Sequence, residues 1–157
     1  MKIWLPLDSF ALAMGGEEVA GAILAEAGKR GVAVSLTRNG SRGMAWLEPL
    51  VEVEVSGVRH AFGPMKPADV PALFDDLAAH PKALGPTEDL DWMKGQTRLT
   101  FARVGVTDPL SLAEYRAHGG LAGLDRALTM QKAQIVQEVA DSGLRGRGGA
   151  GLSLIHI

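Results

Sequence analysis

The feature that most constrains the fold is a helical repeat at residues 17–30, which lies between two short apolar runs. Its apolar face is formed by Val19, Ala20, Ile23, Leu24 and Ala27. Glutamates begin the repeat and basic residues end it, so both ends complement the helix dipole. The flanking runs, 2–7 and 32–37, are typical of strands. A crossover of this length predicts a β-α-β unit with parallel strands.

A β-β-α pattern follows this unit. Valine alternates with polar residues at 51–55, which predicts a half-buried strand, and 58–62 is its expected hairpin partner after Gly57. Residues 67–79 have a helical period. The order β-α-β then β-β-α predicts an α/β fold, a thioredoxin-like mixed sheet with helices, over residues 1–85.

The remainder of the chain is predicted to be mainly helical. Residues 86–96 are rich in proline, glycine and acidic groups and are expected to be a linker. Alternating apolar residues predict an extended segment at 97–106. Helices are expected from Asp108-Pro109 to Gly119, over 121–130 and over 131–142. We expect residues 97–151 to be the start of a second domain, too short to close its own core.

Composition excludes several classes of protein. Hydrophobic residues make up 46% of the 157 residues, too many for a disordered chain. A net charge of -2 argues against binding of nucleic acid through net charge. The chain has no cysteine, which excludes disulfides, thiol catalysis and cysteine-ligated metal centres in these residues. It has no apolar run of membrane-spanning length, and Pro6 and Asp8 interrupt the only signal-like start, so we expect a cytoplasmic protein without a membrane partner.

Residues 142–151 carry the clearest chemical signal. Four glycines in six residues leave backbone N–H groups open to a ligand, and Arg145 and Arg147 add donors suited to phosphate. A dinucleotide or flavin phosphate is the ligand that this composition favours. The spacing satisfies G-x-G-x-x-G, but it follows a predicted helix rather than a strand, which excludes a Rossmann site. A plain glycine-rich turn is the alternative.

Read as a whole, S-G-L-R-G-R-G-G-A-G at 142–151 resembles the nucleotide loop of the flavin-bearing, NADH-oxidising subunits of complex I and its relatives. The preceding residues, from Asp108-Pro109 through Gly119-Gly120 to Ala127-Leu128, resemble the helical approach to that loop. Further upstream, the segments at 38–43, 46–53, 80–86 and 96–103 resemble the beta subunit of soluble NAD-dependent formate dehydrogenases.

The resemblance implies a diaphorase subunit with FMN, NAD and [4Fe-4S] cofactors. Electrons from formate would pass through iron–sulfur centres to FMN, which reduces NAD+. The implied partners are a molybdenum-containing formate dehydrogenase alpha subunit and a small iron–sulfur subunit. Carried over by position, the implied cofactor-binding residues are Gly146, Arg147, Gly148, Gly149, Ala150 and Gly151. The alternatives are a non-catalytic docking module, or the diaphorase subunit of an NAD-reducing hydrogenase or of complex I.

The chain departs from the family after Gly151. It reads L-S-L-I-H-I instead of F-P-x-G-x-K-W, so we interpret it as truncated, with a spurious tail at 152–157. The cluster-ligating cysteines are absent as well. The chain alone is therefore expected to bind FMN and NAD poorly and to be inactive.

Other polar and aromatic residues have simpler interpretations. The four histidines lack metal-ligand spacing and are expected in turns or at the surface. Glu52 and Glu54 are expected to be solvated, and Trp4 and Trp46 to lie in the core. Two groups allow two interpretations each: the acidic group Glu88, Asp89 and Asp91 as solvated linker or docking patch, and the loop residues Arg38, Asn39 and Arg42 as turn or subunit contact.

Overall fold

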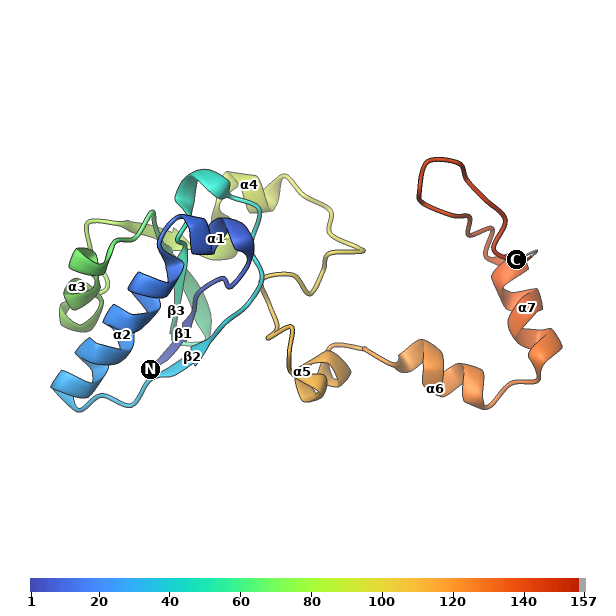
Figure 1. Cartoon of the computed structure of the whole chain (residues 1–157), viewed down its shortest axis with the longest axis horizontal. Helices are drawn as coiled ribbons and strands as arrows, with labels where there is room; N and C mark the ends of the chain where they lie inside the picture. Colours follow the sequence, from blue (N-terminus) through green and yellow to red (C-terminus); the bar gives the residue numbers. More distant parts are fainter. Residues whose placement is uncertain (156–157) are drawn as a thin grey trace. The chain divides into compact units, whose positions relative to one another are not determined.

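The computed structural model describes residues 1–155. The chain divides into two compact units, the first ending at Glu114 and the second beginning at Tyr115. The first unit is an α/β fold around a five-stranded sheet in the order β2-β1-β3-β4-β5 (Figure 1). Its strands are β1 (Lys2–Trp4), β2 (Ser35–Thr37), β3 (Val51–Val55), β4 (Val58–Phe62) and β5 (Ala83–Pro86). β1 and β2 are parallel and the other pairs are antiparallel, so the predicted mixed sheet is confirmed.

The β-α-β unit forms as its sequence predicts. The Asp8 side chain accepts hydrogen bonds from the amides of Phe10 and Ala11 and caps α1 (Ser9–Ala13). α2 (Gly16–Arg30) follows and ends at Gly31, whose φ of 66° suits a glycine cap. The chain then enters β2 beside β1, with Ile3 opposite Leu36.

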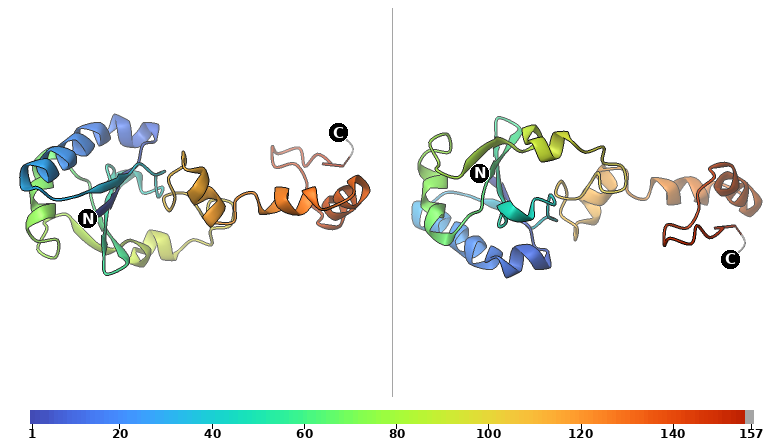
Figure 2. Two further views of the ribbon diagram at one scale, coloured as in Figure 1. Left: turned by 90° about the horizontal axis from the view of Figure 1, so that it is seen from below. Right: turned by 90° about the horizontal axis from the view of Figure 1, so that it is seen from above.

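Strand alternation gives the sheet two different faces. One face packs against α2 and α3 (Val70–Asp75), which share a core with β1, β3 and β4. That core contains Ile3, Leu5, Val19, Ala20, Ile23, Val51, Val53, Phe62, Met65, Val70 and Leu73. The helices of this face lie together on one side of the strands (Figure 2). All eleven side chains are nearly or fully buried, so this cluster is the main source of hydrophobic stability.

A smaller cluster covers part of the opposite face. Met44, Leu50, Ala61 and Met93 are buried together. Ala61 lies in β4 and Met93 in α4 (Asp91–Lys94), while Met44 directly precedes η1 (Ala45–Leu47) and Leu50 directly precedes β3. The segment predicted as a linker at 86–96 therefore contains the end of β5, η3 (Thr87–Asp89) and α4. Each of these elements is only three or four residues long, which is too short for a periodic sequence pattern, so the proline and glycine content dominated the prediction.

Two sequence expectations for this unit were wrong. The extended segment expected at 97–106 is a series of turns. Its backbone carbonyls accept hydrogen bonds from the side chains of Arg59 and Asn39 instead of forming a strand ladder. The helix expected at 67–79 is shorter: η2 (Pro67–Asp69) leads into α3, which ends at Asp75 because the Asp76 carboxylate accepts from the amides of Ala78 and Ala79 and forms a turn.

The second unit contains short helices. α5 (Leu112–Ala117) straddles the division between the units, and α6 (Ala122–Leu128) and α7 (Lys132–Asp141) follow. All three lie where helices were predicted. Within residues 115–155, Gly120 is the only buried residue. The structural division falls after Glu114, whereas composition placed the linker at 86–96; the domain boundaries themselves stay predictions. None of the helices described is long and apolar enough to cross a membrane.

Candidate functional site

The glycine-rich loop follows the end of α7 and folds back on itself. Gly143, with φ of 64°, reverses the chain after the helix. The amide of Gly146 donates to the Leu152 carbonyl at 2.8 Å, and Arg145 forms an isolated bridge with Ser153. Residues 146–151 therefore form the tip of a closed loop beyond α7 (Figure 1). The last two residues of the tail predicted to be spurious lie outside the described residues.

The structure explains the presence of glycine differently at different positions of the loop. Gly149 and Gly151 have φ values of 94° and 58°, a region that L side chains rarely adopt. A Cβ on Gly146 would lie 3.3 Å from the Leu152 amide. Gly148 has neither constraint, since its φ is not positive and, apart from its two chain neighbours, no described residue has an atom within 4 Å of its Cβ position. Among the described residues, neither a backbone angle nor a neighbouring atom therefore requires glycine at 148.

The loop is also cationic and open. Arg145 and Arg147 are exposed, and neither forms an ion pair among the described residues. Their guanidinium groups are available to an anion, and the bare backbone at Gly148 and Gly149 leaves room for it. The six predicted cofactor-binding residues thus lie together on one loop; their role in binding stays a prediction.

The described residues contain no group of three potential metal-ligating side chains. His80, expected in a turn or at the surface, does lie in a turn but is buried: its ring contacts the Asp69 carbonyl and the Lys82 amide.

A buried ion-pair network in the first unit was not anticipated. Arg42 Nε lies 2.8 Å from Glu52 Oε1, and Arg59 Nη1 lies 3.1 Å from Glu52 Oε2. Arg42 also reaches Glu88 at 3.0 Å. Glu52 is 2% exposed, so the expectation that it is solvated was wrong, whereas Glu54 is partly exposed and pairs with Lys2. The two arginines compensate the Glu52 carboxylate, whose burial alone would be unfavourable, and Glu88 offsets the second positive charge.

Arg59 also holds the 97–107 segment on the sheet. Its guanidinium donates to the carbonyls of Gly105 at 2.7 Å and Val106 at 2.6 Å, and it lies 3.7 Å from the ring centroid of Trp4. Burial lowers the pKa of Arg59 from its ordinary value. Asn39 Nδ2 donates to the Gly105 carbonyl as well. Because Asn39 and Arg42 are buried, the structural interpretation of their loop is the one supported.

Glu48 is a second buried carboxyl group. Its carboxylate oxygens accept hydrogen bonds from Ser41 Oγ at 2.7 Å and from the Leu50 amide at 2.9 Å. Glu48 is only 1% exposed. Burial raises the pKa of Glu48, and this effect outweighs the two hydrogen bonds that lower it. No sequence signal marks this group, because Glu48 lies in a segment without a periodic pattern.

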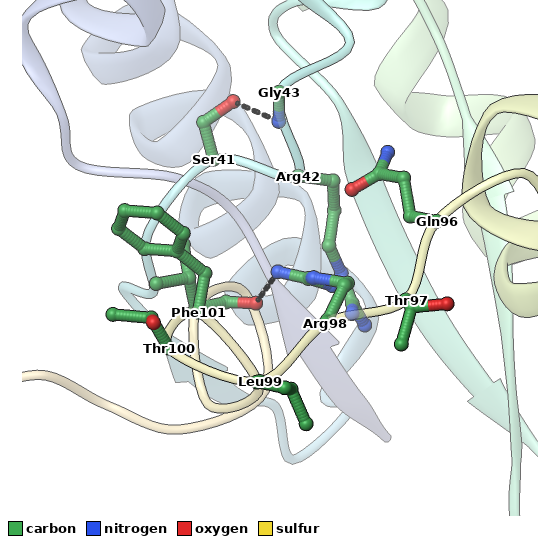
Figure 3. A pocket seen from close by; sticks show the side chains of 10 residues that line it. Ser41, Arg42, Gly43, Gln96, Thr97, Arg98, Leu99, Thr100 and Phe101 are labelled. Atoms are coloured by element: carbon green, nitrogen blue, oxygen red, sulfur yellow. Dashed lines mark hydrogen bonds between the residues drawn. The ribbon is translucent and has the colours of Figure 1, made fainter. Parts of the chain in front are cut away.

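An open cavity of about 470 Å3 lies between the 41–43 and 96–104 segments (Figure 3). Arg98 extends along it and donates to the Val104 carbonyl at 2.7 Å, while Leu99 and Phe101 stand at its rim, 83% and 67% exposed. Ser41 also lines the cavity, and its hydroxyl donates to the buried Glu48 carboxylate.

Comparison with known proteins identifies relatives of part of the chain. A segment of 58 residues, 37% of the chain, is 48% identical to the NADP-reducing hydrogenase subunit HndC of Solidesulfovibrio fructosivorans. A segment of 46 residues, 29% of the chain, is 50% identical to a subunit of the NADH-quinone oxidoreductase of Escherichia coli and, equally, to that of Salmonella typhimurium. The chain matches only 10–12% of these relatives' length. No protein-family model matches it.

Part of the chain is therefore similar to subunits of NAD(P)-linked oxidoreductases. The relatives are subunits of a hydrogenase and of a quinone oxidoreductase. They support the resemblance to NADH-oxidising subunits, and they do not support the resemblance to formate dehydrogenase in particular.

Proposed function

We propose that this chain is part of an electron-transfer flavoprotein subunit that exchanges electrons between NAD(H) and a partner enzyme. The observation that carries the proposal is the open, cationic loop at 142–151, in which the bare backbone at Gly148 and Gly149 lies beside the exposed Arg145 and Arg147. The partial identity to two kinds of oxidoreductase subunit supports the same class. When bound, FMN would supply hydride exchange with the nicotinamide.

In this proposal the loop binds and orients the cofactors. The amides near Gly148 and Gly149 would approach phosphate oxygens, and Arg147 would provide charge-assisted hydrogen bonds. Iron–sulfur centres would have to be ligated elsewhere, because this chain has no cysteine.

The identity of the electron donor is a more specific proposal than the class of subunit. The upstream resemblance favours formate, oxidised by a molybdenum-containing subunit, whereas the named relatives favour a hydrogenase or a quinone oxidoreductase. Purification of the native complex that contains this chain, followed by NAD+ reduction with formate or with hydrogen, separates these donors. Reduction with hydrogen alone would exclude the formate proposal and retain the diaphorase proposal.

Gly148→Ala in the intact subunit tests the loop directly. The added methyl group meets no described residue beyond its chain neighbours, so we expect unchanged stability. Binding of flavin or NADH should become at least about tenfold weaker, measured as flavin content and as the KM for NADH in ferricyanide reduction. Gly123→Ala, in α6 and equally unobstructed, is the matched control. An intact subunit without flavin, or one in which both variants behave alike, would refute the proposal.

A further inference from the structure

Two tryptophans form an exposed pair on the first unit. Trp46 of η1 and Trp92 of α4 lie with ring centroids 5.2 Å apart and planes at 90°. They are 59% and 47% exposed, so the expectation that Trp46 lies in the core was wrong, whereas Trp4 is buried. Exposed tryptophans in contact are unusual on a monomer's surface and common at the centre of protein interfaces.

The pair is held firmly from below. Met44, two residues before Trp46, and Met93, directly after Trp92, are both buried in the small core cluster of the sheet. The Trp92 indole nitrogen lies 3.6 Å from the Cβ position of Gly43. A partner would therefore meet a preformed aromatic surface and lose little side-chain entropy in ordering it.

Three exposed carboxylates lie within four residues of Trp92 in the sequence. Glu88 and Asp89 of η3 have side chains 70% and 64% exposed, and Asp91 at the start of α4 is exposed. Lys94, paired with Asp89 at 3.3 Å, is the exposed cation of α4, while Arg42, which reaches Glu88, is itself buried against Glu52. A cationic group over an indole face gains further from cation–π attraction.

We propose that Trp46, Trp92 and the carboxylates of Asp89 and Asp91 form a docking surface for an arginine- or lysine-bearing segment of a partner protein. The 470 Å3 cavity adjoins this surface, since Gly43 and Gln96 line it and the Gln96 side chain donates to the Trp92 carbonyl. Its rim residues Leu99 and Phe101 can contact an apolar side chain of the same segment. The partner segment is therefore expected to carry both basic and apolar side chains. This surface is separate from the glycine-rich loop.

A labelled synthetic peptide of alternating arginine and leucine tests the proposal, with its glutamate–leucine counterpart as the charge control. Fluorescence anisotropy with the 157-residue chain should detect the basic peptide and not the acidic one. Trp46→Ser and Trp92→Ser should each weaken binding at least about tenfold. Asp89→Asn with Asp91→Asn should weaken it, and Lys94→Gln should strengthen it, because these changes move the local charge in opposite directions.

Matched controls keep the result interpretable. Glu18→Gln with Asp125→Asn removes the same number of carboxylates elsewhere and should leave the peptide affinity unchanged. Equal binding of both peptides, indifference to the tryptophan changes, or parallel effects of the Asp89/Asp91 and Lys94 changes would overturn the proposal. Sedimentation showing that the tryptophans mediate self-association would assign the surface to a second copy of the chain and overturn it as well.

Discussion

At the scale of single residues, the first unit is organised around charges that lie beneath its surface. Glu52 receives two arginines, and each arginine has a further partner: Glu88 for Arg42, and the 105–106 carbonyls for Arg59. Breaking such a pair from one side leaves an uncompensated buried charge, which costs more than the pair itself contributes. The network therefore fixes where the 97–107 segment lies on the sheet.

Gly105→Ala should destabilise the first unit strongly. Gly105 has a φ of 77°, and a Cβ there would overlap Arg42 Cδ, so the substitution adds backbone strain and displaces a buried guanidinium. We expect a loss of at least about 2 kcal/mol in the free energy of unfolding, measured by urea denaturation. Gly28→Ala, in the exposed part of α2 with no neighbour within 4 Å, should stabilise by about 0.5–1 kcal/mol. Similar effects for both would contradict the packing described for Gly105.

Glu48→Gln should change the pH dependence of stability. Burial raises the pKa of Glu48 in the folded chain above its unfolded value, so the folded state binds the extra proton between these two pKa values. Its contribution to stability is therefore lost as the pH rises through this window. Glutamine does not ionise, so the urea midpoint of wild type relative to the variant should fall from about pH 4 to pH 7. If the midpoint of wild type relative to the variant stays constant or rises with pH, ionisation of Glu48 does not destabilise the folded chain.

At the scale of elements, sequence patterns predicted what local periodicity determines. The strands at 51–55 and 58–62 were placed at their observed bounds, because alternation and a turn glycine define a hairpin locally. The turns at 97–107 were missed, because their conformation depends on Arg59 and Asn39, which are distant in sequence. Glu52 and Trp46 were misplaced for the same reason: the strand pattern at 51–55 has a polar face, but only the tertiary fold decides what covers it.

The sequence predicted where the candidate site lies and which residues form it, but not what each residue does. Ten consecutive loop residues were sufficient for the resemblance, but the roles of individual glycines depend on φ and on neighbours. Only the structure distinguishes Gly149, which the backbone requires, from Gly148, which it does not.

The helices of the second unit should open easily. α6 and α7 contain no buried residue, and Leu128 and Val136 are 76% and 53% exposed. Short helices without tertiary packing are marginal in water. In the 157-residue chain, hydrogen exchange followed by mass spectrometry should show amides of α7 exchanging orders of magnitude faster than those of α2. Equal protection in α2 and α7 would show that the second unit has a stable core of its own.

At the scale of the whole molecule, the two units differ in how they can be stabilised. The first has a continuous core on one face of its sheet and a smaller one on the other. The second has apolar side chains but no core among its described residues. A loop positioned by loosely held helices binds weakly, because the ligand must also order the loop. The 157-residue chain should accordingly show no stoichiometric flavin absorbance after purification with excess FMN; a full flavin band would contradict this.

Thermal unfolding should report the first unit alone. Near 60 °C, cooperative unfolding absorbs about 0.7 kcal/mol per residue, so the unit formed by residues 1–114 predicts a calorimetric enthalpy of about 80 kcal/mol, against about 110 kcal/mol for all 157 residues. Ile23→Ala removes a fully buried side chain and should cost about 2–5 kcal/mol, which lowers the Tm by at least about 6 °C. Leu128→Ala, in exposed α6, should leave the Tm within about 2 °C. An enthalpy near the larger value, or equal Tm shifts for the two variants, would mean that both units unfold as one.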